Sequence, residues 1–413
     1  MSKFSQPLVS PRKVGELSRS SYDKSIDPKW ILSDGSVASQ AQYPELYLVV
    51  GDSHIPVNTK IALPSTLPTG AASGCASSSD GTYIAIATAA LPYIKFYKNT
   101  NNVYSELSAP SVLPPGAASG VSCDDAGVYW SVTTGAPDYI TLYKRTGDTF
   151  TKLSTPTGGI GAAASGSSWS GDGNYFTATY GATPFMTNFY RTGDTFAAMT
   201  APSLGDSPTG ATSASAWSYD GSNLTVLQAP TPYAIHYKRS GSTLIKLATP
   251  ESVPTGACSQ ASYSDDGSLL CIAHPAAPYL TLYTRSGDVF TNLDLPVLMP
   301  TSASSGVTIS GDGRFLYLPY AAAPFFNIYK KRLDNTFALL TGQVAPPAGA
   351  PTVSVLSKDG STVVLANAPT PFMGIYRAVP HYDPETEFLL PHPELSNHNG
   401  SLLDTLFYIK AKS

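Results

Sequence analysis

Charged residues are scarce in this sequence. Lys, Arg, Asp and Glu make up 13% of its 413 residues, about half of the ~25% that is usual in soluble globular domains. The formal net charge is −4 and no block of like charges occurs, so the chain lacks the broad positive field of nucleic-acid binders. We therefore expect no nucleic-acid partner and no fold dominated by long helices.

Cysteines and long apolar runs are also few. No Cys-x-x-Cys pair is present, which disfavours a zinc knuckle or a disulfide scaffold and fits synthesis in a reducing compartment. The four cysteines are Cys75, Cys123, Cys258 and Cys271. Residues 1–23 are polar and lack the apolar core of ~7–15 residues that a secretory signal needs. No run approaches the ~20 apolar residues of a membrane span, so we expect neither secretion nor membrane insertion.

The sequence does contain a repeat. A motif of Pro, an apolar or aromatic residue and a closing Tyr recurs at intervals of 46, 47, 47, 46, 46 and 47 residues, at Tyr97, Tyr143, Tyr190, Tyr237, Tyr283, Tyr329 and Tyr376. A turn pair lies 17 residues before each closing Tyr, and 18 once, at Asp80-Gly81, Ala126-Gly127, Asp172-Gly173, Asp220-Gly221, Asp266-Gly267, Asp312-Gly313 and Asp359-Gly360. Both markers give seven repeats.

Each repeat contains four short strand-like runs, here called a, b, c and d, as in residues 74–79, 83–88, 93–98 and 104–109. The a–b and c–d links read as tight hairpin turns, so each repeat is expected to form a four-stranded antiparallel meander. One such sheet cannot bury both of its faces, whereas copies packed around an axis can. The predicted fold is all-β, a seven-bladed β-propeller.

The strand tally predicts how the ring closes. A d-type run at residues 58–64 precedes the first a–b–c set, and only six more d runs follow. We expect the early strand to complete the last blade and join the two ends of the ring. The predicted division is an N-terminal arm and docking module at 1–56, the propeller at 57–377 and a C-terminal extension at 378–413. A strand-like run at 405–410 in that extension is expected to pair with an edge strand of its own chain or of a neighbour.

The Ser-x-Asp-Gly-x-Tyr pattern, as in Ser79 to Ile84, resembles the WD-repeat and lactonase-like propellers. This resemblance covers about three quarters of the chain and implies the fold alone. The Trp-Asp dipeptide and Gly-His pair of typical WD repeats are missing.

A second resemblance lies upstream, at residues 30–51. The segment is similar to the phage tail-collar element of tail-fibre and other virion proteins, and the matching positions are Trp30, Asp34, Gly35, Tyr43, Leu46, Tyr47 and Gly51. Asp34-Gly35 reads as a turn, Ser39 as a helix cap and residues 43–50 as a short amphipathic helix. The Leu-Pro-Asp-x-Arg-Gly segment that usually follows is absent, so we expect only a small docking module. The alternative is a surface helix that covers the ring.

No catalytic, cofactor or metal site is expected. The Asp of each Asp-Gly pair recurs in six of seven repeats, which is typical of a turn former. His236 and His274 lie within repeats, and the histidines of the tail, at 381, 392 and 398, have no metal-ligand spacing. No phosphate-binding loop and no Gly-x-Ser-x-Gly elbow with partners occurs. The sequence predicts a protein that is not an enzyme.

The two faces of the disc differ in charge. The a–b and c–d side carries Lys and Arg interspersed with Asp, which is typical of a solvated rim. The b–c and d–a side is rich in Ala and Pro, and its charges are acidic, Asp138, Asp206 and Glu251. An aromatic residue opens each c strand beside this side, at Tyr93, Tyr139, Phe185, Tyr233, Tyr279, Phe325 and Phe372. These rings either pack between blades or stack on a sugar or an apolar partner.

Together these features favour a non-enzymatic structural component of a bacteriophage virion, on the tail or the capsid surface and made in the host cytoplasm. The expected partners are other virion proteins, with a host receptor or a glycan as a further candidate. No heptad pattern predicts a trimer, and the oligomeric state stays open. The alternatives are a cellular propeller that scaffolds protein complexes and a propeller glycosidase or lactonase with a few unrepeated acids in its channel.

Overall fold

The computed structural model describes residues 59–203, 205–331, 335–340, 347, 349–358 and 360–377, together with the backbone of five short strands nearer the chain ends. Every regular element of these residues is a β-strand. The chain divides into two units, one of Val57–Val379 and one of Met1–Pro56 with Pro380–Ser413.

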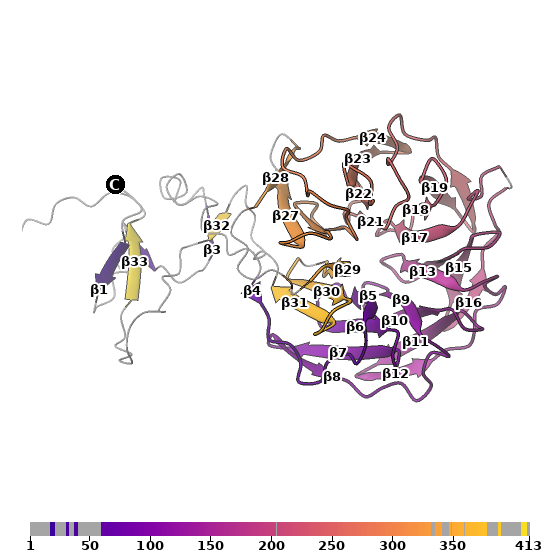
Figure 1. Cartoon of the computed structure of the whole chain (residues 1–413), viewed down its shortest axis with the longest axis horizontal. Helices are drawn as coiled ribbons and strands as arrows, with labels where there is room; N and C mark the ends of the chain where they lie inside the picture. Colours follow the sequence, from indigo (N-terminus) through magenta and orange to yellow (C-terminus); the bar gives the residue numbers. More distant parts are fainter. Residues whose placement is uncertain are drawn as a thin grey trace, which may run out of the picture. The chain divides into compact units, whose positions relative to one another are not determined.

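The larger unit consists of seven four-stranded antiparallel sheets arranged in a ring (Figure 1). The a strands are β5 (Ala72–Ser77), β9 (Ala118–Cys123), β13 (Ala164–Trp169), β17 (Thr212–Trp217), β21 (Gln260–Tyr263), β25 (Thr308–Ile309) and β29 (Pro351–Leu356). The b strands are β6 (Tyr83–Thr88), β10 (Tyr129–Thr134), β14 (Tyr175–Tyr180), β18 (Asn223–Gln228), β22 (Leu269–Ala273), β26 (Phe315–Pro319) and β30 (Thr362–Asn367). The c strands are β7 (Ile94–Thr100), β11 (Ile140–Thr146), β15 (Met186–Thr192), β19 (Ala234–Ser240), β23 (Leu280–Ser286), β27 (Phe326–Lys331) and β31 (Met373–Arg377). The d strands are β8 (Val103–Glu106), β12 (Thr149–Lys152), β16 (Thr195–Ala198), β20 (Thr243–Lys246), β24 (Val289–Asn292), β28 (Phe337–Leu339) and β4 (Thr59–Lys60). The predicted seven-bladed propeller is therefore confirmed.

The ring closes as the strand tally predicts. Strand β4 pairs with β31 in blade 7, with Lys60 opposite Tyr376 and Thr59 opposite Arg377. The N–H of Ile61 continues this pairing and donates to the carbonyl of Ile375 at 2.9 Å. Residues more than 300 positions apart thus complete one sheet, which leaves no open sheet face at the junction.

The core lies between neighbouring blades. In the cluster shared by blades 1 and 2, the fully buried Trp130 meets Phe96 edge to face at 5.4 Å. Full burial of one large apolar side chain contributes ~1.5–3 kcal/mol, and the edge-to-face geometry adds to that. In the outer d strands burial is sparser, with one central buried residue such as Phe150 in β12. Each blade is therefore held mainly by its b and c strands.

The closing residue of blade 3 is Phe189, and the predicted Tyr190 lies one residue beyond it. In blade 3 the residue opposite the buried Phe176 is Phe189, whereas Tyr190 pairs with Tyr175 and is 38% exposed. The corresponding Tyr143 of blade 2 is fully buried. Phe189 thus occupies the closing position of blade 3, and its distance from Asp172 becomes 17 residues as in the other repeats. The sequence motif selects Tyr190 because it is a tyrosine, whereas the buried aromatic ring at this position of the fold is Phe189.

The smaller unit joins the two chain ends. Strand β33 (Leu406–Lys410) lies between β1 (Leu17–Ser20) and β2 (Trp30–Leu32), and β3 (Val37–Ser39) pairs with β32 (Glu387–Leu389). The run at 405–410 thus pairs within its own chain. Ser39, expected as a helix cap, lies in β3, and the helix expected at 43–50 falls outside the described residues.

Candidate functional site: the channel, the rim and the link face

The repeated Asp-Gly pair forms the a–b turn. In blade 1 the Ser78 hydroxyl donates to Asp80 at 2.6 Å and accepts a hydrogen bond from the N–H of Tyr83 at 2.9 Å. Asp80 also accepts from the N–H of Thr82 at 3.0 Å. Gly81 has a φ of 67°, a conformation that favours glycine. The side chain of the recurring Asp is therefore used within its own turn.

Blade 2 builds the same turn with a different residue. Here Asp124 replaces the Ser and Ala126 replaces the Asp. The Asp124 carboxylate accepts directly from the N–H groups of Val128 at 2.7 Å and Tyr129 at 2.9 Å. Burial raises the pKa of Asp124 above its ordinary value, and the two backbone donors oppose that rise. The two substitutions are thus a coupled change that keeps the turn.

A ring of hydroxyl groups links the inner strands. Each blade has a Ser or Thr at or near the start of its a strand, and in six of the seven blades its hydroxyl donates to a backbone carbonyl of the next blade. The bonds are Ser73 to Ala118 at 2.6 Å, Ser119 to Ala164 at 2.6 Å, Ser165 to Thr212 at 2.8 Å, Ser213 to Cys258 at 2.8 Å, Ser259 to Ser304 at 3.3 Å and Thr352 to Ala72 at 3.0 Å. Ser305 of blade 6 is the break in this ring, since its buried hydroxyl has no partner among the described residues.

The a strands enclose a central channel of about 370 Å³. Small residues line most of it, because neighbouring inner strands approach closely. A β-carbon on Gly74 would lie 3.0 Å from Cα of Gly120 in the next blade, so only glycine fits there without a shift.

Gln260 crosses this channel wall. Its amide nitrogen donates to the carbonyl of Ser354 at 3.0 Å, and its amide oxygen accepts from the N–H of Val307 at 3.1 Å. It thereby links blades 5 and 7 past the two-residue strand β25 of blade 6.

Unrepeated residues occur where the channel reaches the a–b turns. We call the position two residues before the turn glycine the mouth position of each blade; in order these are Ser79, Asp125, Gly171, Tyr219, Asp265, Gly311 and Lys358. Of them, Asp125, Gly171, Tyr219 and Lys358 line the channel itself. The Lys358 ammonium forms an ion pair with Asp265 at 2.8 Å, across blade 6. Burial raises the pKa of Asp125 to about 6; nearby Lys358 opposes that rise, and the charges of Asp265, Asp124 and Asp172 add to it.

Sequence reasoning missed these charged residues. They stand beside the repeated turn motif, one position after the Ser or Asp that begins it, and the repeat drew attention to the turn. Aligning the seven copies and asking which position changes chemistry from blade to blade would have found Asp125, Asp265 and Lys358.

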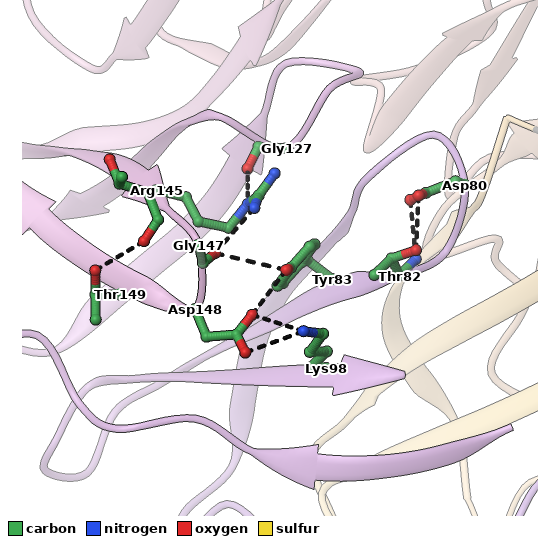
Figure 2. Close-up of polar contacts among 10 residues, drawn as sticks. Asp80, Thr82, Tyr83, Lys98, Gly127, Arg145, Gly147, Asp148 and Thr149 are labelled. Atoms are coloured by element: carbon green, nitrogen blue, oxygen red, sulfur yellow. Dashed lines mark hydrogen bonds and ion pairs between the residues drawn. The ribbon is translucent and has the colours of Figure 1, made fainter. Parts of the chain in front are cut away.

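The rim on the turn side holds neighbouring blades together (Figure 2). The Arg145 guanidinium of blade 2 stacks on the Tyr83 ring of blade 1, 3.9 Å from its centroid. The Tyr83 hydroxyl donates to Asp148 at 2.8 Å, and Lys98 forms an ion pair with the same carboxylate at 2.9 Å. We call these four residues the rim clamp. The rim is therefore more than a solvated surface, because its charges bridge blades.

The rim clamp recurs and then loses parts. Between blades 2 and 3 it consists of Tyr129, Lys144, Arg191 and Asp194, with an ion pair at 2.8 Å. Between blades 3 and 4 the stack of Arg239 on Tyr175 remains, at 4.1 Å. There the Lys position holds Tyr190 and the Asp position holds Ser242, so the two charges are missing together.

The opposite side, here called the link face, contains the seven aromatic residues that open the c strands. All seven are partly buried, and each has a positive φ, between 49° and 75°. In blade 1 the Tyr93 N–H donates to the Ala90 carbonyl at 2.8 Å, and its own carbonyl accepts from Thr88 at 2.9 Å. The same pair of bonds fixes the aromatic residue in every blade.

These rings therefore have a clear place in the b–c turn, and Tyr93 and Tyr233 pack against inter-blade cores. Their use by a partner stays a prediction. The link face also exposes four aliphatic side chains, Leu91, Val112, Val297 and Leu298, by 62%, 48%, 96% and 61%. Asp294 adds a fourth acidic residue to the three that the sequence analysis found there.

The residues that the sequence predicts to form a docking module are described only in part. Trp30 begins strand β2, which pairs with β33. The remaining six, Asp34, Gly35, Tyr43, Leu46, Tyr47 and Gly51, lie outside the described residues.

The two histidines of the repeats are buried within blades. His236 is bonded to Thr225 at 2.9 Å, and burial lowers its pKa to about 3. His274 bonds the carbonyl of Ala276 at 2.7 Å, and burial lowers its pKa as well. Within the described ranges, no group of three or more His, Cys, Asp or Glu is placed to hold a metal ion. In the same part of the chain no helix has the length and apolar character to cross a membrane.

Comparison with known proteins identifies the fold and no family. No family model matches the chain, and no curated protein matches it. Among solved structures it is similar to hydrazine synthase of Kuenenia stuttgartiensis, with a TM-score of 0.57 and 13% sequence identity over 76% of this chain and 97% of that one. At this identity the likeness shows the propeller architecture alone.

Proposed function

We propose that this chain is a non-enzymatic structural component of a bacteriophage virion, carried on the tail or the capsid surface. The observation that carries the proposal is the pairing of the two chain ends in a unit separate from the propeller, where β2 and β33 lie side by side. A module built from both ends is suited to anchor the chain while leaving the propeller whole. The virion assignment rests on the resemblance of residues 30–51 to the tail-collar element.

The propeller is suited to bind other molecules through its surface. Its repeated polar side chains are engaged in turns, in the hydroxyl ring and in the rim clamp, so they act as architecture. The link face is poor in charge and exposes aliphatic side chains such as Leu91 and Val297. A rigid, nearly neutral surface loses little entropy and little charge solvation on docking. We infer that this face meets other virion proteins, or a host receptor or glycan.

Incorporation into particles tests the proposal. Trp30→Ala and Leu46→Ala would each be compared with the rim variant Arg145→Gln in purified virions. We expect at least ~10-fold less incorporation of the two module variants, which corresponds to ~1.4 kcal/mol of binding free energy. Arg145→Gln should be incorporated like the wild type. Unchanged incorporation of both module variants would contradict the anchoring role of residues 30–51, provided that circular dichroism shows all three proteins folded. Absence of the wild-type chain from virions would favour a cellular scaffold.

A specific observation favours an enzyme as the second candidate. Asp125 and Lys358 are unrepeated charged residues that line the channel, the position where a catalytic propeller would hold them, and Asp265 forms an ion pair with Lys358. Turnover of any compound in a panel of glycosides and lactones that Asp125→Asn abolishes would establish this alternative.

A further inference from the structure

The mouth of the channel contains the same arrangement twice, once with its cation and once without. In blades 5 to 7 the mouth positions are Asp265, Gly311 and Lys358, and in blades 2 to 4 they are Asp125, Gly171 and Tyr219. Each triplet places an Asp, a Gly and a larger side chain at successive positions around the ring.

In the first triplet the Asp has a partner within the chain. The Lys358 ammonium lies 2.8 Å from the Asp265 carboxylate. It reaches over Gly311, where a β-carbon would clash with that carboxylate. The missing side chain at Gly311 is therefore what lets the ion pair form across a blade.

In the second triplet, Asp125 has no such partner among the described residues. No ion pair or hydrogen bond joins the Asp125 side chain to the described residues, and its Oδ2 atom is buried. A buried carboxylate oxygen without a donor is unusual in a native fold. Asp124, Asp172, Asp265 and Lys358 act on it electrostatically.

Tyr219 occupies the position in the second triplet that Lys358 has in the first. A β-carbon on Gly171 would lie 2.8 Å from Oδ2 of Asp125 and 2.5 Å from Cδ2 of Tyr219. The carboxylate and the ring thus flank the same glycine. Aromatic faces attract cations, and a carboxylate next to such a face forms a site for an ammonium group.

The surroundings allow a ligand to enter. The Tyr219 residue is 47% exposed, so its ring can turn aside without breaking a dense core. The channel beside it has a volume of about 370 Å³. Ser354, which is 1% exposed, also lines this channel with a hydroxyl that has no partner among the described residues.

We propose that Asp125, Gly171 and Tyr219 form a binding site for a primary alkylammonium group, which takes the place that Lys358 has beside Asp265. The group comes either from a free amine or from the lysine side chain of a protein partner. This inference concerns the propeller alone and does not depend on the virion proposal.

The first test is direct binding to the full chain. The probes are n-butylammonium and Nα-acetyl-lysine methylamide, with Nα-acetyl-norleucine methylamide as the uncharged control, followed by NMR or calorimetry. We expect millimolar binding of both cations, none of the norleucine compound, and at least ~10-fold weaker binding by Asp125→Asn. Asp148→Asn, in the rim clamp, is the matched control and should bind like the wild type. Tighter binding of the lysine compound than of butylammonium would indicate a protein partner, and equal binding a free amine.

A second variant places a lysine side chain of the protein itself next to Asp125. Tyr219→Lys copies the Asp265 and Lys358 pair onto the empty triplet, so it should raise the melting temperature and abolish binding of both cations. The proposal is overturned if the wild type binds neither cation at about 50 mM, if norleucine binds as well as lysine, or if Asp125→Asn binds unchanged. A Tyr219→Lys protein that keeps full binding would also contradict it.

Discussion

The ammonium of Lys358 and the carboxylate of Asp265 meet at 2.8 Å although they belong to blades 7 and 5. The intervening position, Gly311, has no side chain to separate them. Since both residues are about one third exposed, solvent screens the pair, and its contribution to stability is modest.

Removing this cation should destabilise the propeller slightly. Lys358→Met leaves Asp265 without its partner, and we expect a loss of ~0.5–1 kcal/mol in the free energy of unfolding. Lys238→Met breaks the rim pair with Asp288, where both side chains are about half exposed, and should cost less. Urea unfolding of the two variants at low and high salt measures the difference. A larger loss in the free energy of unfolding for Lys238→Met than for Lys358→Met would contradict this prediction.

The rim clamp between blades 3 and 4 lacks its ion pair, and two substitutions can restore it. Tyr190→Lys with Ser242→Asp would copy the Lys98 and Asp148 pair (Figure 2), while Arg239 already stacks on Tyr175. We expect a favourable coupling of ~0.5 kcal/mol between the two substitutions, as in other exposed pairs. A double-mutant cycle by urea unfolding measures it. A coupling of zero would mean that the rim charges do not stabilise the blade contacts.

Because His236 is buried and neutral, we predict that the protein loses stability in mild acid. His236 has a pKa near 3 in the folded chain and ~6.5 when unfolded. Because the unfolded chain binds the proton more readily, stability from this group is present above pH ~6.5 and falls as the pH drops toward 3. At pH 5 the loss is about 1–2 kcal/mol.

His236→Leu tests that assignment, since Leu142 and Leu282 occupy the same position in blades 2 and 5. The variant should lose less stability than the wild type between pH 7 and 5 in chemical unfolding. Part of the acid sensitivity should stay, because burial lowers the pKa of His274 as well. Identical pH profiles for the two proteins would rule out His236 as a source.

Asp125 should have the opposite pH dependence. Its folded pKa of about 6 lies above the ordinary 3.8, so the folded chain binds the proton more readily and the ionised carboxylate destabilises the fold above pH 6. Asp125→Asn should therefore raise stability at pH 7.5 by ~1–3 kcal/mol. The gain should shrink toward zero by pH 4. Thermal unfolding at these two pH values checks it, and a variant that is less stable at pH 7.5 would contradict the assigned burial effect.

The repeat made the fold predictable because period, turn chemistry and strand count all agree. Tyr190 shows the limit of that logic, since the fold conserves a buried ring and accepts Phe189 for it. The coupled pair Asp124 and Ala126 looks like a broken turn motif in the sequence, yet the longer carboxylate side chain reaches both N–H groups by itself.

The site was harder to predict than the fold. Lys358 and Asp265 are 93 residues apart, and only the closed ring places both at one channel mouth. Their partnership also depends on the absence of a side chain at Gly311, which single-residue reasoning does not register. Unrepeated charges beside a repeated turn are the pattern that would have indicated them.

The most direct test of the proposed role is quantitative mass spectrometry of purified phage particles from a culture that produces this chain. The account predicts peptides from both units, such as those around Trp30 and Tyr143, at a fixed ratio to the major virion proteins. Peptides found only in the soluble cell fraction, with none in the particles, would contradict a virion component.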